Sequence, residues 1–269
     1  MINQEVYIGT QGWNYADWFG PFYPPKTPKS DLLTLYSKIF NSVEVDSTFY
    51  AIPSENTLKG WNDKTPDDFI FSLKLLSEIT HKNRLRDCHS LLREYVGRVS
   101  LLGTKLGCIL IQLPPDLSPG EHPALKKFLE ILPEGYHFAV EFRDSGWLTE
   151  AVVETLERVN VAFALTDSRW LPRAKLPEIV DYQRIDFSYI RWLGVRELTD
   201  FGRIQINRRE EFLLWLSIFQ KLQMRNQRIY AYFNNHFQGH SPGSCNEFKT
   251  LLGLKVVSPE TLNPQLSLF

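Results

Sequence analysis

The stretch SVEVDSTFY, residues 42–50, decides how this chain folds. As a strand, it turns Val43 and Val45 to one face and Glu44 and Asp46 to the other, because side chains alternate along a strand. Such a strand needs an apolar layer on one side and a polar space on the other. A barrel of strands surrounded by helices offers both, since one strand face meets the helices and the other lines the lumen.

Runs of the same kind recur along the chain. Seven further β-rich runs are found at 6–10, 69–75, 107–113, 137–143, 161–167, 187–193 and 229–235. Segments with helical spacing lie between most of them, at 30–40, 87–102, 122–132, 148–159 and 208–225. About eight alternating units in 269 residues predict an α/β protein with a TIM-like (β/α)₈ barrel as a single domain. A doubly wound open sheet is the main alternative, but no glycine-rich phosphate turn follows the first strand.

The remaining segments have no clear period. Residues 168–186 and 194–207 read as long loops. We expect the barrel to occupy residues 1–257, and residues 258–269 to form an extended C-terminal tail.

Composition narrows the class of protein. Hydrophobic residues make up 43% of the chain, and the net charge is −1, so global charge does not indicate a nucleic-acid or membrane partner. Cys88, Cys108 and Cys245 are far apart, which is typical of a reducing compartment. No apolar run reaches membrane-spanning length, and the N-terminus has no signal pattern. We therefore expect a cytoplasmic protein with no membrane partner.

The polar faces of the predicted strands converge on the lumen. They carry Glu44, Asp46, Ser72, Lys74, Gln112, Glu141, Arg143, Thr166, Arg191, Tyr232 and Asn234. Most of these residues lie near the C-terminal ends of their strands, where barrel enzymes place their active sites. Because unpaired buried charges are costly, the set forms either a structural ion-pair network or a hydrated site for a polar or anionic ligand.

Each of these groups suggests a role in such a site. Glu44, Asp46, Glu141 and His81 are the candidate acid–base catalysts. Lys74, Arg143 and Arg191 suit an anionic substrate, and Gln112, Tyr232 and Asn234 suit its orientation. The carboxylates could also hold a divalent cation, but the neighbouring cations favour ion pairing and histidines do not cluster, so the cofactor and metal stay open.

Loop residues add further candidates. The aromatic run Trp13, Tyr15, Trp18, Phe19, Phe22 and Tyr23 follows the first strand and either stacks on a base or sugar or packs as a lid. His240 lies four residues after His236, in a loop, and is a candidate for substrate hydrogen bonding. Basic residues at 81–86 and at Arg169, Arg173 and Lys175 raise nucleic acid as a partner.

Several motifs resemble those of the YecE-like family, a domain of unknown function. They are GTQGWNYADWFGPFYP (9–24), VEVDSTFY (43–50), FSLK (71–74), ITH (79–81), LIQLPP (110–115), VEFRDSGW (140–147), YFNN (232–235) and GHSP (239–242). The resemblance covers nearly the whole chain and implies a TIM-barrel-like fold without an assigned activity. That family's barrel is similar to the barrel of endonuclease IV, a metal-dependent repair nuclease. Such nucleases carry clustered histidine ligands, and few histidines here lie near strand ends, which argues against a zinc nuclease mechanism.

The last five residues, QLSLF (265–269), resemble the bacterial sliding-clamp-binding motif. Gln265, Leu266, Leu268 and Phe269 would be its anchors, and the alternative is a tail folded onto its own barrel. The sequence thus favours a protein that binds or processes nucleic acid or another phosphate-bearing substrate, and the clamp-like motif suggests a link to DNA repair. A sugar or sugar-phosphate enzyme and a non-catalytic adaptor are the alternatives.

Overall fold

The computed structural model describes residues 5–194, 197–225 and 228–262. In this part of the chain, parallel strands form one sheet in the order β6-β5-β4-β3-β2-β1-β9-β8-β7. The strands are β1 Val6–Gln11, β2 Ser42–Val45, β3 Ile70–Lys74, β4 Leu106–Gln112, β5 His137–Glu141, β6 Val161–Phe163, β7 Leu165–Ser168, β8 Phe187–Gly194 and β9 Arg228–Phe233. Only Ala164 separates β6 from β7, so the two edges of the sheet are joined through the chain and the ring is nearly closed.

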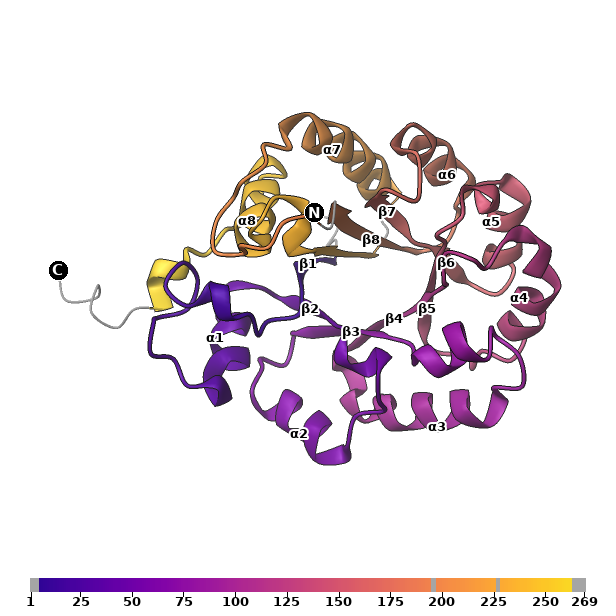
Figure 1. Cartoon of the computed structure of the whole chain (residues 1–269), viewed down its shortest axis with the longest axis horizontal. Helices are drawn as coiled ribbons and strands as arrows, with labels where there is room; N and C mark the ends of the chain where they lie inside the picture. Colours follow the sequence, from indigo (N-terminus) through magenta and orange to yellow (C-terminus); the bar gives the residue numbers. More distant parts are fainter. Residues whose placement is uncertain (1–4, 195–196, 226–227, 263–269) are drawn as a thin grey trace.

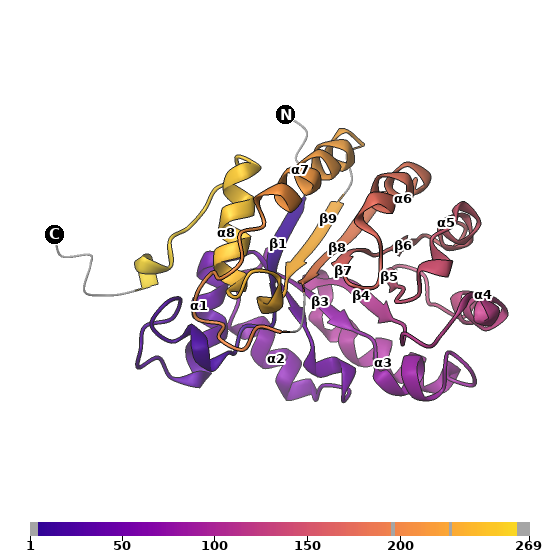
Figure 2. The ribbon, with the colours of Figure 1, turned by 45° about the horizontal axis from the view of Figure 1, so that its top comes forward.

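Helices surround this ring of strands (Figures 1 and 2). They are α1 Leu32–Ile39, α2 Glu55–Asp63, α3 His89–Val99, α4 His122–Leu129, α5 Glu150–Glu157, α6 Leu176–Tyr182, α7 Arg209–Met224 and α8 Ser241–Leu251. The alternation of strand and helix, with parallel pairing throughout, confirms the predicted TIM-like α/β barrel.

The two faces of each strand differ as alternation predicts. Val43, Phe71 and Ile109 are fully buried in the large hydrophobic core that includes the helices. A second apolar cluster, with Cys108, Leu110, Ala139, Phe187 and Tyr230 among its members, is separate from it. Its members alternate with the helix-facing residues, so this cluster fills the lower lumen and leaves the charged residues for the upper end.

Three helices and one strand break differ from the sequence-based expectation. Helix α6 lies inside the segment 168–186 that was expected to be a loop, and α2 and α8 were not predicted. In α2 only Leu58 and Trp61 are buried, so its apolar period is weak. Helix α6 has seven residues and begins with a proline in its first turn, which leaves little period to detect. The predicted strand 161–167 is interrupted at Ala164.

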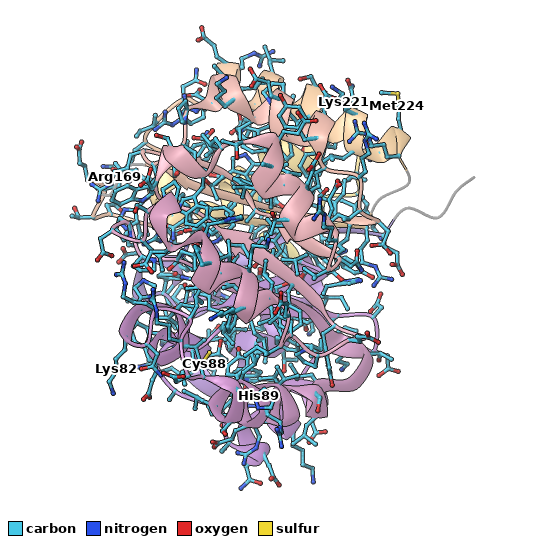
Figure 3. All side chains as sticks on the ribbon, turned by 90° about the vertical axis from the view of Figure 1, so that its right-hand side faces the viewer. Lys82, Cys88, His89, Arg169, Lys221 and Met224 are labelled. Carbon is cyan, nitrogen blue, oxygen red and sulfur yellow. The ribbon has the colours of Figure 1, made fainter. Side chains whose placement is uncertain are left out.

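The two ends of the barrel carry different loops. Lys82 and Arg169, from the loops after β3 and β7, lie on one side of the molecule, opposite Lys221 and Met224 of α7 (Figure 3). Residues Pro259–Leu262 form a 3₁₀ turn with Leu262 buried, where an extended tail was expected. The predicted clamp anchors Gln265, Leu266, Leu268 and Phe269 lie outside the described residues. None of the helices described is both long and apolar enough to cross a membrane.

Candidate functional site

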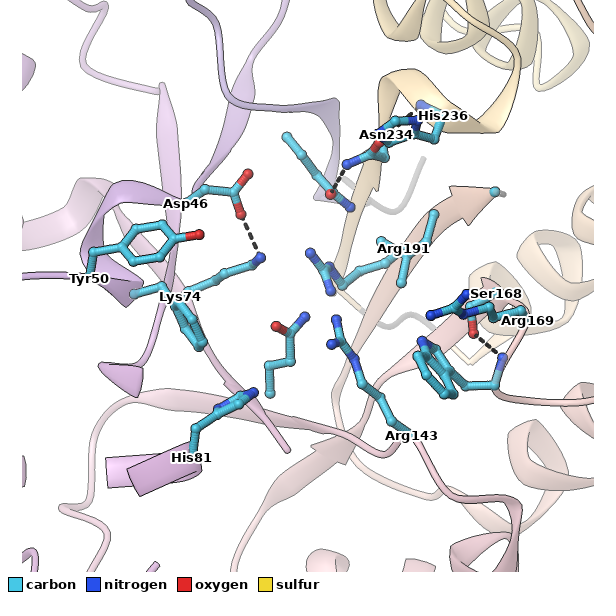
Figure 4. Close-up of a pocket in the computed structure, with 16 residues that line it drawn as sticks. Asp46, Tyr50, Lys74, His81, Arg143, Ser168, Arg169, Arg191, Asn234 and His236 are labelled. Atoms are coloured by element: carbon cyan, nitrogen blue, oxygen red, sulfur yellow. Dashed lines mark hydrogen bonds and ion pairs between the residues drawn. The ribbon is translucent and has the colours of Figure 1, made fainter. Parts of the chain in front are cut away.

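A cavity of about 490 Å³ opens at the C-terminal ends of the strands (Figure 4). It is lined by Gln11, Asp46, Phe49, Tyr50, Lys74, His81, Gln112, Arg143, Ser168, Arg169, Trp170, Arg191, Leu193, Gly194, Asn234 and His236. The structure therefore brings together seven of the predicted site residues: Asp46, Lys74, His81, Gln112, Arg143, Arg191 and Asn234.

A buried ion-pair triad lies at the base of this cavity. Arg191 donates from Nε to Oε2 of Glu44 at 2.8 Å and from Nη2 to Oε1 of Glu44 at 2.7 Å. Its Nη1 donates to Glu141. The Tyr189 hydroxyl donates to Glu44 at 2.7 Å. All three charged side chains are at most 1% exposed, so Glu44 and Glu141 lie behind the cavity wall and Arg191 alone reaches it.

The two carboxylates of the triad have opposite pKa shifts. Burial would raise the pKa of Glu141, but Arg191, Arg143 and Lys74 outweigh it and lower that pKa to about 2. Burial raises the pKa of Glu44, and the charge of Arg191 offsets only part of the effect. With both oxygens of Glu44 held by Arg191, these carboxylates fit the predicted ion-pair network better than the predicted role of acid–base catalysts facing a ligand.

Two further cations, Arg143 and Lys74, border the cavity. Arg143 donates from Nε to Glu141 at 2.9 Å, and its Nη1 and Nη2 have no acceptor among the described residues. The Arg143 side chain reaches into the cavity beside Arg191 (Figure 4). Lys74 pairs with Asp46 at 2.6 Å, and the Asp46 side chain is 37% exposed, so solvent screens this pair.

His81, like Asp46, is a candidate acid–base group that lines the cavity. It belongs to a π-helical turn, Glu78–Lys82, and its Nδ1 lies 2.8 Å from Oγ1 of Thr80. Burial, followed by the charge of Arg143, lowers the pKa of His81. The imidazole is therefore neutral at neutral pH and can accept a proton.

The loop after His81 has a strained backbone, and hydrogen bonds to a neighbouring loop fix its position. Arg84, Leu85 and Asp87 have φ values of 48°, 65° and 49°, in the left-handed region that L-residues rarely adopt. Arg84 donates to Asp116 at 2.8 Å and to Glu121 at 3.1 Å, which ties this loop to the one after β4. Strain of this kind is retained where the surroundings fix the backbone, as they do beside this cavity.

Neutral amides form the wall at β1 and β9. Asn234 donates from Nδ2 to Oε1 of Gln11 at 2.8 Å and accepts from the backbone N–H of His236. Nε2 of Gln11 has no partner within residues 5–194, 197–225 and 228–262, although Gln11 is 1% exposed. A buried amide donor without an acceptor is costly, so this group is available to a ligand oxygen.

Three predicted substrate-binding residues do not line the cavity. The Tyr232 hydroxyl lies 2.6 Å from that of Ser42 and 2.8 Å from that of Ser72, lower in the barrel. His240 bonds through Nδ1 with the carbonyl of Phe201 at 2.8 Å. Trp13 packs edge-on against Trp61. Alternation placed Tyr232 on the lumen face, but it could not give the depth of that residue.

The aromatic run after β1 packs into the main hydrophobic core, and none of its residues lines the cavity. Trp18, Phe22 and Tyr23 are at most 2% exposed and contact one another. The cavity instead takes its aromatic rings from Phe49, Tyr50 and Trp170.

Several lining residues were missed by the sequence reasoning. These are Gln11, Phe49, Tyr50, Ser168, Trp170, Leu193, Gly194 and, as ligand contacts, Arg169 and His236. Alternation along the first strand places Gln11 on the same face as Gly9, and Gln11 is the last residue of that strand. These two facts could have identified Gln11 as a residue that lines the cavity. The loop residues carry no such period.

The described residues include no group of three or more His, Cys, Asp or Glu side chains placed to hold a metal ion. The possible divalent-cation site among Glu44, Asp46 and Glu141 therefore gains no support from the donor set. Each of these carboxylates is instead paired with a cation, Arg191, Lys74 or Arg143.

Comparison with known proteins shows relatives that match most of the chain. The chain is 29% identical over 252 residues to "UPF0759 protein YecE" of Escherichia coli strain K12, covering 86% of each protein. It is 23% identical over 272 residues to "UPF0759 protein YunF" of Bacillus subtilis, covering 93% of this chain and 95% of that protein.

Solved structures agree with this relationship. A DUF72 family protein from Thermotoga maritima superposes with a TM-score of 0.77 at 26% identity, covering 93% of this chain and 99% of that one. A sugar phosphate isomerase/epimerase from Parabacteroides distasonis has a TM-score of 0.53 at 13% identity over 92% of this chain and 95% of that one, which shows a shared fold only. The model of the family "Protein of unknown function DUF72" matches residues 7–266, and this chain therefore belongs to the DUF72 family.

Proposed function

We propose that the cavity binds a phosphate-bearing substrate and that His81 exchanges a proton with it. The observation that carries this proposal is the state of Arg143, whose Nη1 and Nη2 face the cavity without an acceptor among the described residues. A guanidinium fork of this kind matches two oxygens of a phosphate group.

The charge balance at the cavity supports an anionic ligand. Lys74, Arg143, Arg169 and Arg191 line the cavity, whereas Asp46 is the one carboxylate among the lining residues. Glu44 and Glu141 neutralise part of this charge from behind, but their oxygens already accept hydrogen bonds from protein donors. A ligand phosphate is thus the complementary partner for the outward-facing donors.

The size of the cavity favours a small unit. Its volume of about 490 Å³ is within the roughly 300–1,000 Å³ typical of small-molecule sites. A sugar phosphate or one nucleotide is of suitable size, whereas a nucleic-acid duplex would have to expose a single nucleotide to reach the floor. The lowered pKa that His81 has before a ligand binds suits this group to accept a proton from the substrate.

The first prediction tests the phosphate contact. Replacing Arg143→Gln should weaken the binding of ribose 5-phosphate and of inorganic phosphate by about 10- to 100-fold, because one or two charge-assisted hydrogen bonds are lost. Isothermal titration calorimetry measures the affinity, and thermal unfolding checks that the variant is folded. Arg158→Gln is the matched control, since Arg158 is 77% exposed and its ion-pair distance to Glu154 is 4.0 Å.

A second variant guards against loss of the fold. Arg143→Lys keeps the charge beside Glu141 but removes the planar fork, so it should be stable and still bind several-fold more weakly. If the wild-type protein binds neither ligand, or if a folded Arg143→Gln variant binds both as tightly as the wild type, the proposed function is wrong.

We also propose that residues 265–269 dock on the bacterial sliding clamp, which would require a cytoplasmic location. The support is the pentapeptide QLSLF itself, together with the turn Pro259–Leu262, whose Leu262 is buried. Two residues separate this anchored turn from the motif. A short segment of this kind loses little conformational freedom when its apolar side chains enter a pocket.

A further inference from the structure

Tyr50 presents an exposed aromatic ring at the rim of the cavity. It is 78% exposed, and it is the one aromatic side chain among the large hydrophobic residues that are exposed in the described part of the chain. Its ring packs edge-on against Phe49 at a centroid distance of 5.2 Å, and its hydroxyl points toward the middle of the cavity (Figure 4). One face of the ring thus remains open to water beside a charged floor.

A second flat surface lies on the opposite side of the cavity. The guanidinium of Arg169 lies 4.3 Å from the ring centroid of Trp170, and Arg169 makes no ion pair or hydrogen bond with the residues described. Tyr50 and Arg169 lie on opposite sides of the cavity in Figure 4. Tyr50 follows β2 and Arg169 follows β7, so two loops from opposite parts of the ring provide these surfaces.

The loop that carries Trp170 is held in place by hydrogen bonds and an ion pair at its start. Asp167 is 1% exposed and accepts from Nε of Arg173 with both oxygens at 2.9 Å. It also accepts from Nε1 of Trp215 at 2.9 Å. The Trp170 backbone N–H donates to Ser168 at 3.3 Å. The arginine–tryptophan pair therefore has a fixed base, which lowers the ordering cost of ligand binding.

The position of these rings relative to the cations selects a type of ligand. A phosphate held by Arg143 and Lys74 on the floor leaves the rest of the substrate between Tyr50 and the Arg169–Trp170 pair. A planar base has a π-face that stacks on aromatic rings and guanidinium groups, at roughly 1–3 kcal/mol per base. The unpaired Nε2 of Gln11 supplies a buried donor for a ring or sugar oxygen. A sugar phosphate alone has no flat ring to fill this space.

We infer that the substrate is a nucleotide unit, whose phosphate lies on the cationic floor and whose base stacks at the rim between Tyr50 and the Arg169–Trp170 pair. This inference rests on the proposed function, because it assumes the phosphate site. The nucleotide is either free or part of a single strand, since the two share this chemistry.

The test compares phosphate ligands with and without a base. Isothermal titration calorimetry with uridine and adenosine monophosphates, ribose 5-phosphate and inorganic phosphate should show at least one nucleotide binding about 5- to 150-fold more tightly than ribose 5-phosphate. Trp170→Ala and Tyr50→Ala should each reduce this ratio, because each should weaken nucleotide binding more than ribose 5-phosphate binding. Trp170→Phe should retain most of it. Met224→Ala is the matched control for Tyr50, because Met224 is also 78% exposed and lies at the other end of the barrel.

The outcomes separate the two proposals. If ribose 5-phosphate binds and neither nucleotide binds more tightly, a single-stranded oligonucleotide decides the outcome. Tyr50-dependent binding of the oligonucleotide would support the inference, with the polymer as the source of the nucleotide. Without such binding, the nucleotide inference is wrong and the phosphate site stands. If the two alanine variants weaken ribose 5-phosphate and the nucleotides equally, the base is not stacked at this rim. If no phosphate compound binds, the proposed function itself fails.

Discussion

At the scale of single residues, the barrel places a guanidinium where two carboxylates would otherwise repel each other. Removing each ion of the triad from water costs several kcal/mol, and only close pairing and further hydrogen bonds offset this cost. Glu44 has such partners in Arg191 and Tyr189, and Glu141 has them in Arg191, Arg143 and Gln112. The triad therefore holds Arg143 in position, and Arg143 turns its remaining donors to the cavity.

Acid titration should reveal the role of Glu141. The pKa of Glu141 in the folded protein, about 2, lies below the ordinary value of 4.5, so its charged form stabilises the fold above pH 4.5. That contribution is lost as the pH falls from 4.5 toward 2. Glu141→Gln should lower the free energy of unfolding by about 3 kcal/mol at neutral pH. The difference in unfolding free energy between the wild type and Glu141→Gln should shrink by about 2 kcal/mol between roughly pH 7 and pH 3, as measured by urea unfolding.

An exposed acid provides the control for this experiment. Glu154 of α5 is 56% exposed, and Glu154→Gln should change the unfolding free energy by less than about 0.5 kcal/mol at every pH. A gap between wild type and Glu141→Gln that stayed constant with pH would contradict the assigned pKa and its cause.

At the scale of elements, strands β1 and β2 are joined partly through a side chain. The hydroxyl of Tyr36 in α1 accepts from the N–H of Thr10 at 2.9 Å and donates to the carbonyl of Ser42 at 3.0 Å. Gly9 leaves room for this contact, because a Cβ there would lie 1.9 Å from the Ser42 carbonyl oxygen and 2.9 Å from the Tyr36 hydroxyl. Glu44 follows two residues later, so the spacing of these strands also sets the position of the triad.

Gly9→Ala should therefore destabilise the barrel by several kcal/mol, because backbone and not a flexible side chain blocks the new methyl group. Gly60→Ala in α2 is the matched control, since a Cβ there meets no atom within 4 Å. That change should stabilise the protein by about 0.5–1 kcal/mol through helix propensity. Thermal or urea unfolding measures both, and equal effects would show that strand spacing at Gly9 is not restrictive.

At the scale of the whole molecule, the barrel and the segment after it carry separate proposals. The cavity lies within the ring of strands, whereas the turn Pro259–Leu262, which precedes residues 265–269 in the sequence, lies at the periphery (Figure 1). Deleting residues 265–269 should abolish binding to purified sliding clamp, and the same deletion should leave ribose 5-phosphate binding and thermal stability unchanged.

Surface plasmon resonance with immobilised clamp measures this interaction. Met224→Ala serves as a full-length control with an equally minor surface change. Retained clamp binding after the deletion, or no binding by the wild type, would end the clamp proposal without affecting the cavity.

The sequence by itself determined the order of the elements and the face to which most strand residues point. The period of two along each strand separates Val43 and Val45 from Glu44, and the repetition of this pattern in about eight segments leads to a parallel barrel. The same reasoning correctly predicted that one end of the barrel carries Lys74, Gln112, Arg143, Arg191 and Asn234. Helices α2 and α6 were not predicted, because the apolar period of α2 is too weak and that of α6 is too short.

Only the tertiary structure decided depth, pairing and the contribution of the loops. Alternation gives a side of the sheet but no height in the barrel, so it could not tell that Tyr232 lies below the cavity while Asn234 borders it. Pairing depends on distances between strands far apart in sequence, such as the 147 positions between Glu44 and Arg191. Tyr50 and Trp170 reach the same rim because their loops follow strands of a closed ring, a relation that no local period records.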